Sequence, residues 1–312
     1  MYDVIGDIHG CADELVQLLE LLGYREQQGI YRHPSRKVLF CGDFIDRGPR
    51  IRDVVHICRG MWENDAALAV LGNHELNALA FHTPHPGIAD GWLRPRTEQN
   101  VHQHRATLNQ LDDADLSGAL NWFRQLPASL DLGELRAVHA CWDPAELRLM
   151  SDRAATDGWL SAAFLQSAFD RSDRLFGAME RVLKGPEVQL PGGVRLVDKE
   201  GHSRGTARIR WYEEPGMSSC GEYLFPAVEH PELLAVGVPG TVRPCPYPAD
   251  APPLFFGHYW LATPTPAPLA PNLACLDYSV ARGGLLVAYR FTGERVLRGE
   301  SFVAVRRGAY PG

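Results

Sequence analysis

The motif G-D-I-H-G (residues 6–10) follows the strand-like run Tyr2–Ile5, and the motif G-D-F-I-D-R-G (residues 42–48) follows the run Val38–Cys41. Short apolar runs of this kind predict β-strands, and glycine allows the backbone to turn sharply where a strand ends. In an α/β sheet, ligands bind where the carboxyl ends of the strands meet. We therefore expect the polar side chains of the two motifs to lie close together.

Three further apolar runs end in side chains that can bind a metal ion: Asn73 and His74 follow Ala67–Leu71, His139 follows Leu135–Val138, and His258 follows Leu254–Phe256. Taken singly, each feature has an ordinary explanation as a turn, as a helix N-terminus capped by Asn73, or as a buried core histidine. All five in one chain, each after a predicted strand, favour a shared site.

The ligand types of this predicted site are carboxylate, amide and imidazole, without cysteine. Such donors suit Mn, Fe, Zn, Co or Ni ions rather than a structural zinc site. A carboxylate between two ions can bridge them, and two ions about 3.5–4 Å apart stabilise both the attacking and the leaving oxygen of a phosphoryl transfer. The pattern thus predicts a two-metal hydrolase.

Helical patterns over Leu15–Leu22 and Ile51–Trp62 alternate with the first strands, which predicts a layered α/β fold. Residues 151–183 are helical in pattern, and 188–205 predict a hairpin or loop. Further strand-like runs follow at Arg208–Tyr212, Leu233–Val238, Leu254–Phe256, Leu273–Leu276, Leu285–Phe291 and Phe302–Val305. Because no linker-like break in composition occurs, we expect one domain over 1–312 with an inserted helical cap or substrate region at about 145–250.

The composition excludes several classes of protein. The formal net charge of −7 provides no overall positive field for a nucleic acid or an anionic membrane. The seven cysteines form no C-x-x-C pair and are too sparse for a disulfide scaffold, which predicts reduced thiols in the cytoplasm. We expect no signal peptide, no membrane span and no stable protein partner.

As a set, G-D-I-H-G (6–10), G-D-F-I-D-R-G (42–48), G-N-H-E (72–75), His139 and G-H (257–258) resemble the calcineurin-like metallophosphoesterase superfamily. They are most similar to its phosphoprotein phosphatase branch, which includes bacterial diadenosine tetraphosphatases. The resemblance implies an α/β/β/α sandwich of two packed sheets with helices outside and a helical insertion. It also implies metal-dependent hydrolysis of a phosphorylated substrate.

The resemblance further implies a role for each matching residue. Two divalent ions, with Mn2+ the first expectation, would be held by Asp7, His9, Asp43, Asn73, His139 and His258, with Asp43 bridging them. His74 would protonate the leaving oxygen, and Asp46 would orient the ring of His74. Arg47 would hold a phosphate oxygen bidentately. A metal-bound hydroxide would attack in line, without a covalent phosphoenzyme.

The motifs leave the substrate open. Asp46 and Glu75 resemble protein phosphatases and the phosphatase modules of bacterial RNA repair, whereas Leu276-Asp277-Tyr278 with Gly283-Gly284 resembles the ending of nucleotide phosphatases. The first hypothesis is a phosphatase acting on a nucleotide, a small molecule, a nucleic acid end or a phosphoprotein. The alternative is a dinucleoside polyphosphate hydrolase that cleaves a phosphoanhydride, for example of diadenosine tetraphosphate.

Residues 195–210 contain five basic and two acidic side chains in an otherwise acidic chain. We expect Arg204 or Arg208 to bind a substrate phosphate, against the alternative of an exposed hairpin paired with surface carboxylates. We assign no catalytic role to His102 and His104. His82 and His85, in a proline-containing loop, are candidates for the rim of the substrate groove.

Overall fold

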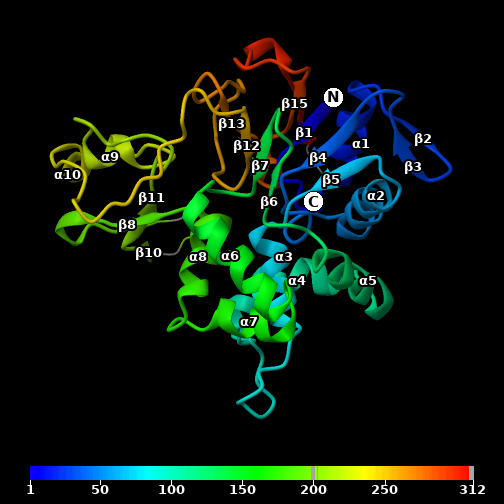
Figure 1. Cartoon of the computed structure of the whole chain (residues 1–312), viewed down its shortest axis with the longest axis horizontal. Coiled ribbons are helices and arrows are strands. Elements are labelled where there is room, and N and C mark those ends of the chain that lie inside the picture. The colour runs from blue at the N-terminus through cyan, green and yellow to red at the C-terminus, as the bar shows by residue number, and fades with distance from the viewer. Residues whose placement is uncertain (198–200, 202, 309–312) are drawn as a thin grey trace.

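Two β-sheets form the centre of the protein in the computed structural model, which describes residues 1–197, 201 and 203–308 (Figure 1). The larger sheet has the order β14 (Asp277–Tyr278), β15 (Leu285–Phe291), β1 (Tyr2–Ile5), β4 (Lys37–Phe40) and β5 (Ala67–Ala69), and β16 (Phe302–Arg306) also pairs with β15. The smaller sheet has the order β13 (Leu273–Cys275), β12 (Leu254–Phe256), β7 (Arg136–Val138) and β6 (Ser129–Asp131). Asp198, Lys199, Glu200 and His202 of the predicted basic segment lie outside the described residues.

The central strands of both sheets are parallel. In the larger sheet β1 pairs with β4 and β4 with β5, and in the smaller sheet β12 pairs with both β7 and β13. The carboxyl ends of neighbouring parallel strands lie at the same edge of each sheet. This arrangement brings the loops after β1, β4, β5, β7 and β12 together.

The two sheets pack face to face. The ring of Phe255 on β12 lies 5.0 Å from that of Tyr289 and 6.2 Å from that of Phe291, both on β15. All three side chains are buried, and burial of a large apolar side chain contributes roughly 1.5–3 kcal/mol. The predicted two-sheet sandwich is therefore present.

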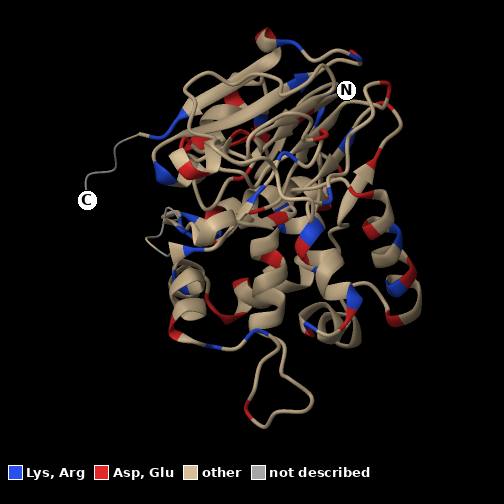
Figure 2. Ribbon diagram, turned by 90° about the vertical axis from the view of Figure 1, so that its left-hand side faces the viewer, with Lys and Arg blue, Asp and Glu red and all other residues tan. Residues whose placement is uncertain are grey.

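Helices α1 (Ala12–Leu21) and α2 (Ile51–Glu63) cover the larger sheet, α1 against β15 and β16 and α2 against β5. Helix α2 buries one face, formed by Ile51, Val54, Val55, Cys58 and Met61, at the spacing of an amphipathic helix. Helices α3 (Asn73–Phe81), α4 (Glu98–Gln110) and α5 (Asp113–Phe123) follow in the chain. Figure 2 shows most of the remaining helices gathered below the two sheets.

Between β7 and β12 the chain first forms three helices, α6 (Pro144–Asp157), α7 (Ala162–Phe169) and α8 (Arg174–Lys184). The side chains of Asp143, Ser161 and Asp173 cap their N-termini. Two small ladders follow, β8 (Glu187–Gln189) with β11 (Thr206–Arg208) and β9 (Leu196–Val197) with β10 (Ser203–Arg204), and then α9 (Cys220–Tyr223) and α10 (Pro231–Leu234). The helical pattern predicted over 151–183 is thus confirmed.

Two predicted strands are wrong. Residues 233 and 234 belong to the short helix α10, which begins at Pro231, rather than to a strand over Leu233–Val238. In the run Arg208–Tyr212, Arg208 ends β11 and Ile209 forms an isolated bridge with Leu224. In the described part of the chain, no helix combines the length and hydropathy that crossing a membrane requires.

Candidate metal centre

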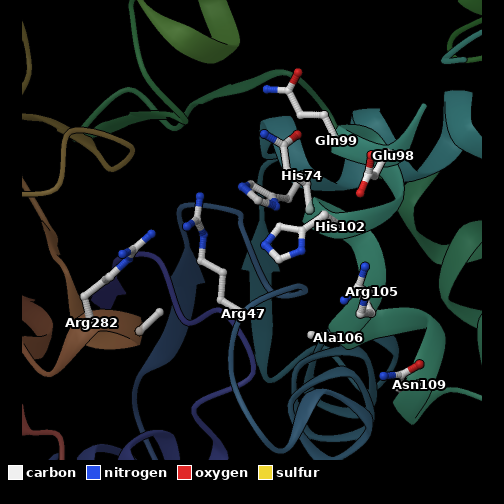
Figure 3. A pocket seen from close by; sticks show the side chains of 11 residues that line it. Arg47, His74, Glu98, Gln99, His102, Arg105, Ala106, Asn109 and Arg282 are labelled. Carbon is white, nitrogen blue, oxygen red and sulfur yellow. The ribbon is translucent and has the colours of Figure 1, made fainter. Parts of the chain in front are cut away.

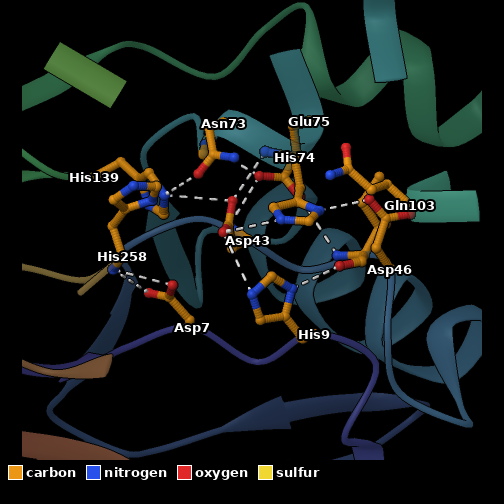
Figure 4. A network of polar contacts seen from close by, with 12 residues as sticks. Asp7, His9, Asp43, Asp46, Asn73, His74, Glu75, Gln103, His139 and His258 are labelled. Atoms are coloured by element: carbon orange, nitrogen blue, oxygen red, sulfur yellow. Dashed lines mark hydrogen bonds and ion pairs between the residues drawn. The ribbon is translucent and has the colours of Figure 1, made fainter. Parts of the chain in front are cut away.

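Six predicted ligands lie at the carboxyl ends of five strands and face one another (Figure 4). Each is at most 7% exposed; the set comprises Asp7 and His9 after β1, Asp43 after β4, Asn73 after β5, His139 after β7 and His258 after β12. The loops are too far apart in sequence to be joined by local structure. The parallel strands of the two sheets bring them together.

Asp43 belongs to two groups of ligand atoms. One group is His9, Asp43 and His74, and the other is Asp43, His139 and His258. Nε2 of His9 lies 3.4 Å from Oδ2 of Asp43, and Nε2 of His139 lies 3.4 Å from Oδ1. Because the two oxygens of one carboxylate face different groups, Asp43 has the geometry of a bridging ligand.

Hydrogen bonds fix two of the histidine rings with Nε2 toward the centre. Nδ1 of His9 donates to the carbonyl of Ile45 at 2.8 Å, and Nδ1 of His139 donates to that of Cys41 at 2.7 Å. Such bonds to the outer nitrogen select the tautomer whose other nitrogen binds a metal. In both rings, Nε2 is therefore the nitrogen available for an ion.

Two buried nitrogens support an ion at this position. Nε2 of His9 and Nε2 of His258 have no hydrogen-bond partner among the described residues. Burial lowers the pKa of His9 to about 3 and that of His258 well below its usual range, so both rings are neutral and carry a lone pair. Two divalent ions, one in each group of ligand atoms, would satisfy these two nitrogens, and the residues present therefore fit such ions.

The remaining predicted ligands lie beside the two groups. Both carboxylate oxygens of Asp7 accept from the backbone amide of His258, at 3.1 and 3.2 Å, and Oδ1 of Asn73 lies 3.0 Å from Nε2 of His139. Burial, together with the charge of Asp277, raises the pKa of Asp7 well above its ordinary value. A cation close to these carboxylates would offset the repulsion between them.

Glycine is required where two of these loops approach a carboxylate. A Cβ atom added at Gly257 would lie 1.9 Å from Oδ1 of Asp7, and one added at Gly72 would lie 2.3 Å from Oδ1 of Asp43. Neither carboxylate can move away without leaving the centre. The glycines that precede the ligands in the sequence motifs therefore leave room for the ligands themselves.

Glu75 organises the loop that carries Asp43. Its Oε2 accepts from the backbone amides of Asp43 at 2.8 Å and Gly72 at 3.1 Å, and its Oε1 accepts from Phe44 at 2.8 Å. The side chain is fully buried, and burial, followed by the charge of Asp43, raises its pKa to about 7. Glu75 thus joins the first turn of α3 to the loop after β4.

Backbone strain is concentrated at the same place. Eleven described non-glycine residues have a positive φ, and six of them belong to this site or its edge: His9, Asp43, Asp46, Arg47, His258 and Trp260. Each such conformation costs of order 1–3 kcal/mol and persists where the surrounding contacts enforce it. The strain therefore marks this region as one built for function rather than for stability.

The predicted acid and its orienting carboxylate are in contact. Nδ1 of His74 lies 2.5 Å from Oδ2 of Asp46. Burial alone would raise the pKa of Asp46, but the hydrogen bonds from His104 and His74, together with the charge interactions of the two rings, outweigh burial and hold the pKa well below the usual range. Asp46 is therefore an anion that accepts from His74, which leaves Nε2 of His74 as the nitrogen available to a substrate.

A pocket of about 810 Å³ lies next to His74 (Figure 3). One wall is the exposed face of α4, which contributes Glu98, Gln99, His102, Gln103, Arg105, Ala106 and Asn109, and the opposite side contains Arg47, Ala281 and Arg282. The guanidinium carbons of Arg47 and Arg282 lie 4.2 and 5.4 Å from the ring centroid of Trp260. Three arginines thus surround the space next to the predicted acid.

A family model described as calcineurin-like phosphoesterase matches residues 2–175, more than half of the chain. The chain belongs to the calcineurin-like phosphoesterase family. This membership confirms the predicted family and fold class. The ends of β1, β4, β5 and β7, which carry five of the six predicted ligands, lie within the matched residues.

Curated relatives of this phosphoesterase are nucleosyl-tetraphosphatases. It is 45% identical over 74 residues to an asymmetrical bis(5'-nucleosyl)-tetraphosphatase of Halalkalibacterium halodurans, covering 23% of this chain and 30% of the relative. It is 42% identical over 146 residues to that of Bacillus velezensis, covering 45% and 55%. With a symmetrical bis(5'-nucleosyl)-tetraphosphatase of Methylococcus capsulatus it shares 34% over 143 residues, covering 45% and 43%. The chain spans less than two thirds of each relative.

Arg204 and Arg208 were also predicted to bind phosphate in this phosphoesterase, but their surroundings differ from those of Arg47. Nε of Arg208 donates to the carbonyl of Lys184 at 2.9 Å, and its charge contributes, after burial, to the lowered pKa of His258. Arg204 lies on the exposed strand β10. Neither is among the residues that line the pocket beside His74. Their role in phosphate binding stays a prediction.

Sequence reasoning assigned no role at this site to four residues: Glu75, which it noted only within the G-N-H-E motif, and His104, Thr107 and Arg282. His104 was assigned no catalytic role, yet it is 1% exposed and its Nδ1 lies 2.8 Å from Oδ1 of Asp46. Arg282 follows the Leu276-Asp277-Tyr278 motif, which the sequence related to nucleotide phosphatases. That motif could have pointed to Arg282 as a site residue. The contact of His104 with Asp46 depends on the tertiary packing of α4 and has no such sequence motif.

Proposed function

We propose that this phosphoesterase hydrolyses phosphate esters at a centre of two divalent metal ions that share Asp43. The observation that carries the proposal is the position of Asp43, whose two oxygens face separate groups of histidines. The two lone-pair nitrogens of His9 and His258 support it. His74 and Asp46 beside the same centre supply the acid that hydrolysis of a poor leaving group requires.

In this proposal one ion is held by Asp7, His9 and Asp43. The other ion is held by Asp43, Asn73, His139 and His258. Mn2+ is the proposed metal, since oxygen and imidazole donors without thiolate suit it. When bound, the two ions polarise the phosphoryl group and lower the pKa of water towards neutrality. Burial alone would lower the pKa of His139, but the charge of Asp43, its hydrogen bond to the ring and the charge of Asp7 together outweigh burial and raise the pKa to about 10. An ion bound there would therefore replace a proton.

The protein's own side chains supply binding and proton transfer. Arg47 lies against Trp260 at the edge of the pocket, where its planar guanidinium can bind two phosphate oxygens. Water forms the new bond to phosphorus as the bond to the leaving oxygen breaks. His74, oriented through Nδ1 by Asp46, donates the proton that this leaving oxygen takes up.

A second candidate, cleavage of a phosphoanhydride in a dinucleoside polyphosphate, is favoured by the pocket. Because His74 protonates the leaving oxygen, whatever occupies the space beside it belongs to the leaving group. That space contains Arg105, Arg282 and His102, which suit an anionic leaving group such as a nucleoside polyphosphate. The relatives named bis(5'-nucleosyl)-tetraphosphatase support the same substrate class.

A product assay with the Mn2+-loaded protein tests both candidates. Diadenosine tetraphosphate, 5'- and 3'-phosphorylated oligonucleotides and a phosphopeptide are supplied in parallel, and the products are separated by chromatography. We expect release of adenine nucleotides from the tetraphosphate, and loss of this activity in Asp43→Asn. If the protein released inorganic phosphate from the monoesters but left diadenosine tetraphosphate intact, the anhydride candidate would be overturned. If it hydrolysed none of the substrates, both candidate functions would be overturned.

Selectivity of the pocket is tested by Arg282→Gln, with Arg148→Gln as the matched control because Arg148 is exposed on α6 outside the pocket. We expect Arg282→Gln to reduce kcat/KM for diadenosine tetraphosphate about tenfold more than for p-nitrophenyl phosphate, whose leaving group carries no phosphate. Equal effects on both substrates would place Arg282 outside the leaving-group site.

We further propose that the protein is a single domain whose residues 145–250 form a cap, and that it acts in the cytoplasm. All seven cysteines are unpaired and six of them are buried, which supports a reducing compartment. Limited proteolysis tests the first point, since release of a stable 1–140 fragment would contradict one domain. Fractionation of the source cells tests the second.

A further inference from the structure

Asp46 is held on the side away from His74 by two residues of α4. Its Oδ1 accepts a hydrogen bond from the hydroxyl of Thr107 at 2.5 Å and from Nδ1 of His104 at 2.8 Å. The backbone amide of Asp46 donates to the same hydroxyl at 3.1 Å. Because three bonds fix both the backbone and the side chain of Asp46, its carboxylate cannot turn away from His74.

The chain of hydrogen bonds continues to a second histidine. Nε2 of His104 lies 3.2 Å from Nε2 of His82, at the C-terminal end of α3. A carboxylate oxygen only accepts, so Nδ1 of His104 carries a proton and its Nε2 pairs with His82. Burial, followed by the charges of His104 and Arg96, lowers the pKa of His82 to about 4, which leaves His82 neutral near neutral pH.

Aromatic packing holds the two rings in place. The ring of Phe81 lies 5.1 Å from that of His104 and 5.2 Å from that of His82. The guanidinium of Arg96 lies over the ring of Phe81, 4.9 Å from its centroid. A hydrogen-bonded network of this kind, with Asp46 and His104 buried, fixes one arrangement of its members.

We propose that His104 and His82 are positioning residues that, through Asp46, fix the tautomer and orientation of His74 for proton donation to the leaving group. The four side chains form one line: His82, His104, Asp46 and His74, at successive distances of 3.2, 2.8 and 2.5 Å. The inference rests on the proposed function, in which His74 is the proton donor. It adds two residues that touch neither the substrate nor the metal ligands.

The kinetic test compares leaving groups. His104→Leu keeps the volume of the side chain but removes the donor to Asp46, whereas His104→Asn retains an N–H group near the position of Nδ1. Phenyl phosphate requires protonation of its leaving oxygen, and 2,4-dinitrophenyl phosphate does not. We expect His104→Leu to lose about tenfold more kcat on phenyl phosphate than on the dinitrophenyl ester, and His104→Asn to recover most of that loss.

His82→Leu tests the outer end of the line. We expect a smaller loss with the same dependence on the leaving group, about threefold, because the partner of His104 is removed while the bond to Asp46 remains. His56→Leu, at an exposed histidine of α2, is the matched control. Melting temperature and Mn2+ affinity are measured for every variant, and both should stay close to the wild-type values.

The positioning role would be overturned if His104→Leu and His82→Leu lost equal factors of kcat on the two esters. It would also be overturned if His104→Asn did not recover activity at an unchanged melting temperature. His74→Ala separates this inference from the proposed function. If His74→Ala shows no dependence on the leaving group, the proton-donor role itself fails. If it shows that dependence and the His104 variants do not, the role of the line alone fails. The ¹⁵N shifts of His104 give a second readout, since we expect a proton on Nδ1.

Discussion

The backbone amide of Asp43 donates a 2.8 Å hydrogen bond to the buried carboxylate of Glu75, which joins the candidate bridging ligand to the first turn of α3. The side chain of Glu75 also accepts from Phe44 and Gly72. One carboxylate therefore joins the loops that follow two neighbouring strands, β4 and β5. Residues that orient ligands in this way influence metal affinity nearly as strongly as the ligands.

Glu75→Gln should weaken Mn2+ binding by about 10–100-fold, because one carboxylate oxygen becomes an NH2 group facing a backbone donor. The unmatched donor should also lower the free energy of unfolding by about 1–3 kcal/mol. Calorimetric titration with Mn2+ and urea unfolding measure the two effects. Glu134→Gln, at an exposed glutamate, is the control, and an unchanged Mn2+ affinity in Glu75→Gln would contradict the role of Glu75.

Gly257→Ala should abolish hydrolysis of p-nitrophenyl phosphate and weaken Mn2+ binding. The added Cβ would lie 1.9 Å from Oδ1 of Asp7, so the carboxylate or the loop of His258 must move. The control is Gly177→Ala in α8, where no atom lies within 4 Å of the added Cβ. That substitution should raise the free energy of unfolding by about 0.5–1 kcal/mol. Wild-type kinetics in Gly257→Ala would show that Asp7 is dispensable.

Arg208→Ala should reduce kcat/KM for p-nitrophenyl phosphate about tenfold, since a guanidinium near His258 would stabilise phosphate charge. Arg204→Ala should have a smaller effect because Arg204 is exposed on β10. Steady-state kinetics of the two variants make the comparison. Wild-type kinetics in Arg208→Ala would remove this residue from substrate binding.

His82 should make the protein less stable in mild acid. Its pKa in the folded protein is about 4, below the unfolded value of about 6.5, so the unfolded chain binds more protons between these values. Stability is therefore fully present above pH 6.5 and decreases as the pH falls through this range. In His82→Gln this contribution is absent. Urea unfolding at pH 7 and pH 4.5 should show a smaller decrease for the variant; equal decreases would contradict the burial of a neutral His82.

The central strands and the closeness of the predicted ligands in space were predictable, because each predicted ligand directly follows an apolar run and a turn at a strand end. Tyr2–Ile5, Leu254–Phe256 and Leu285–Phe291 were predicted with the observed bounds. The run Leu233–Val238 was misassigned because a short apolar segment fits a buried helix as well as a strand. Here Pro231 begins a helical turn.

The surroundings of the site were less accessible from the sequence. Glu75 is adjacent to His74, but its bonds to residues 43 and 44 exist because α3 packs against the loop after β4. His104 reaches Asp46 from α4, 58 residues away, and its motif V-H-Q-H resembles an ordinary polar helix. Arg282 becomes part of the pocket only when η2 (Val280–Arg282) lies opposite α4. Each of these contacts depends on tertiary packing.

The number of Mn2+ ions bound per chain tests the central claim most directly. Equilibrium dialysis followed by elemental analysis of the wild-type protein should give two ions, because Asp43 belongs to two separate groups of side chains that could each hold an ion. Asp43→Asn should weaken both sites together while the far-ultraviolet circular dichroism spectrum stays unchanged. One ion per wild-type chain, or two tightly bound ions in Asp43→Asn, would contradict a centre in which this carboxylate is shared.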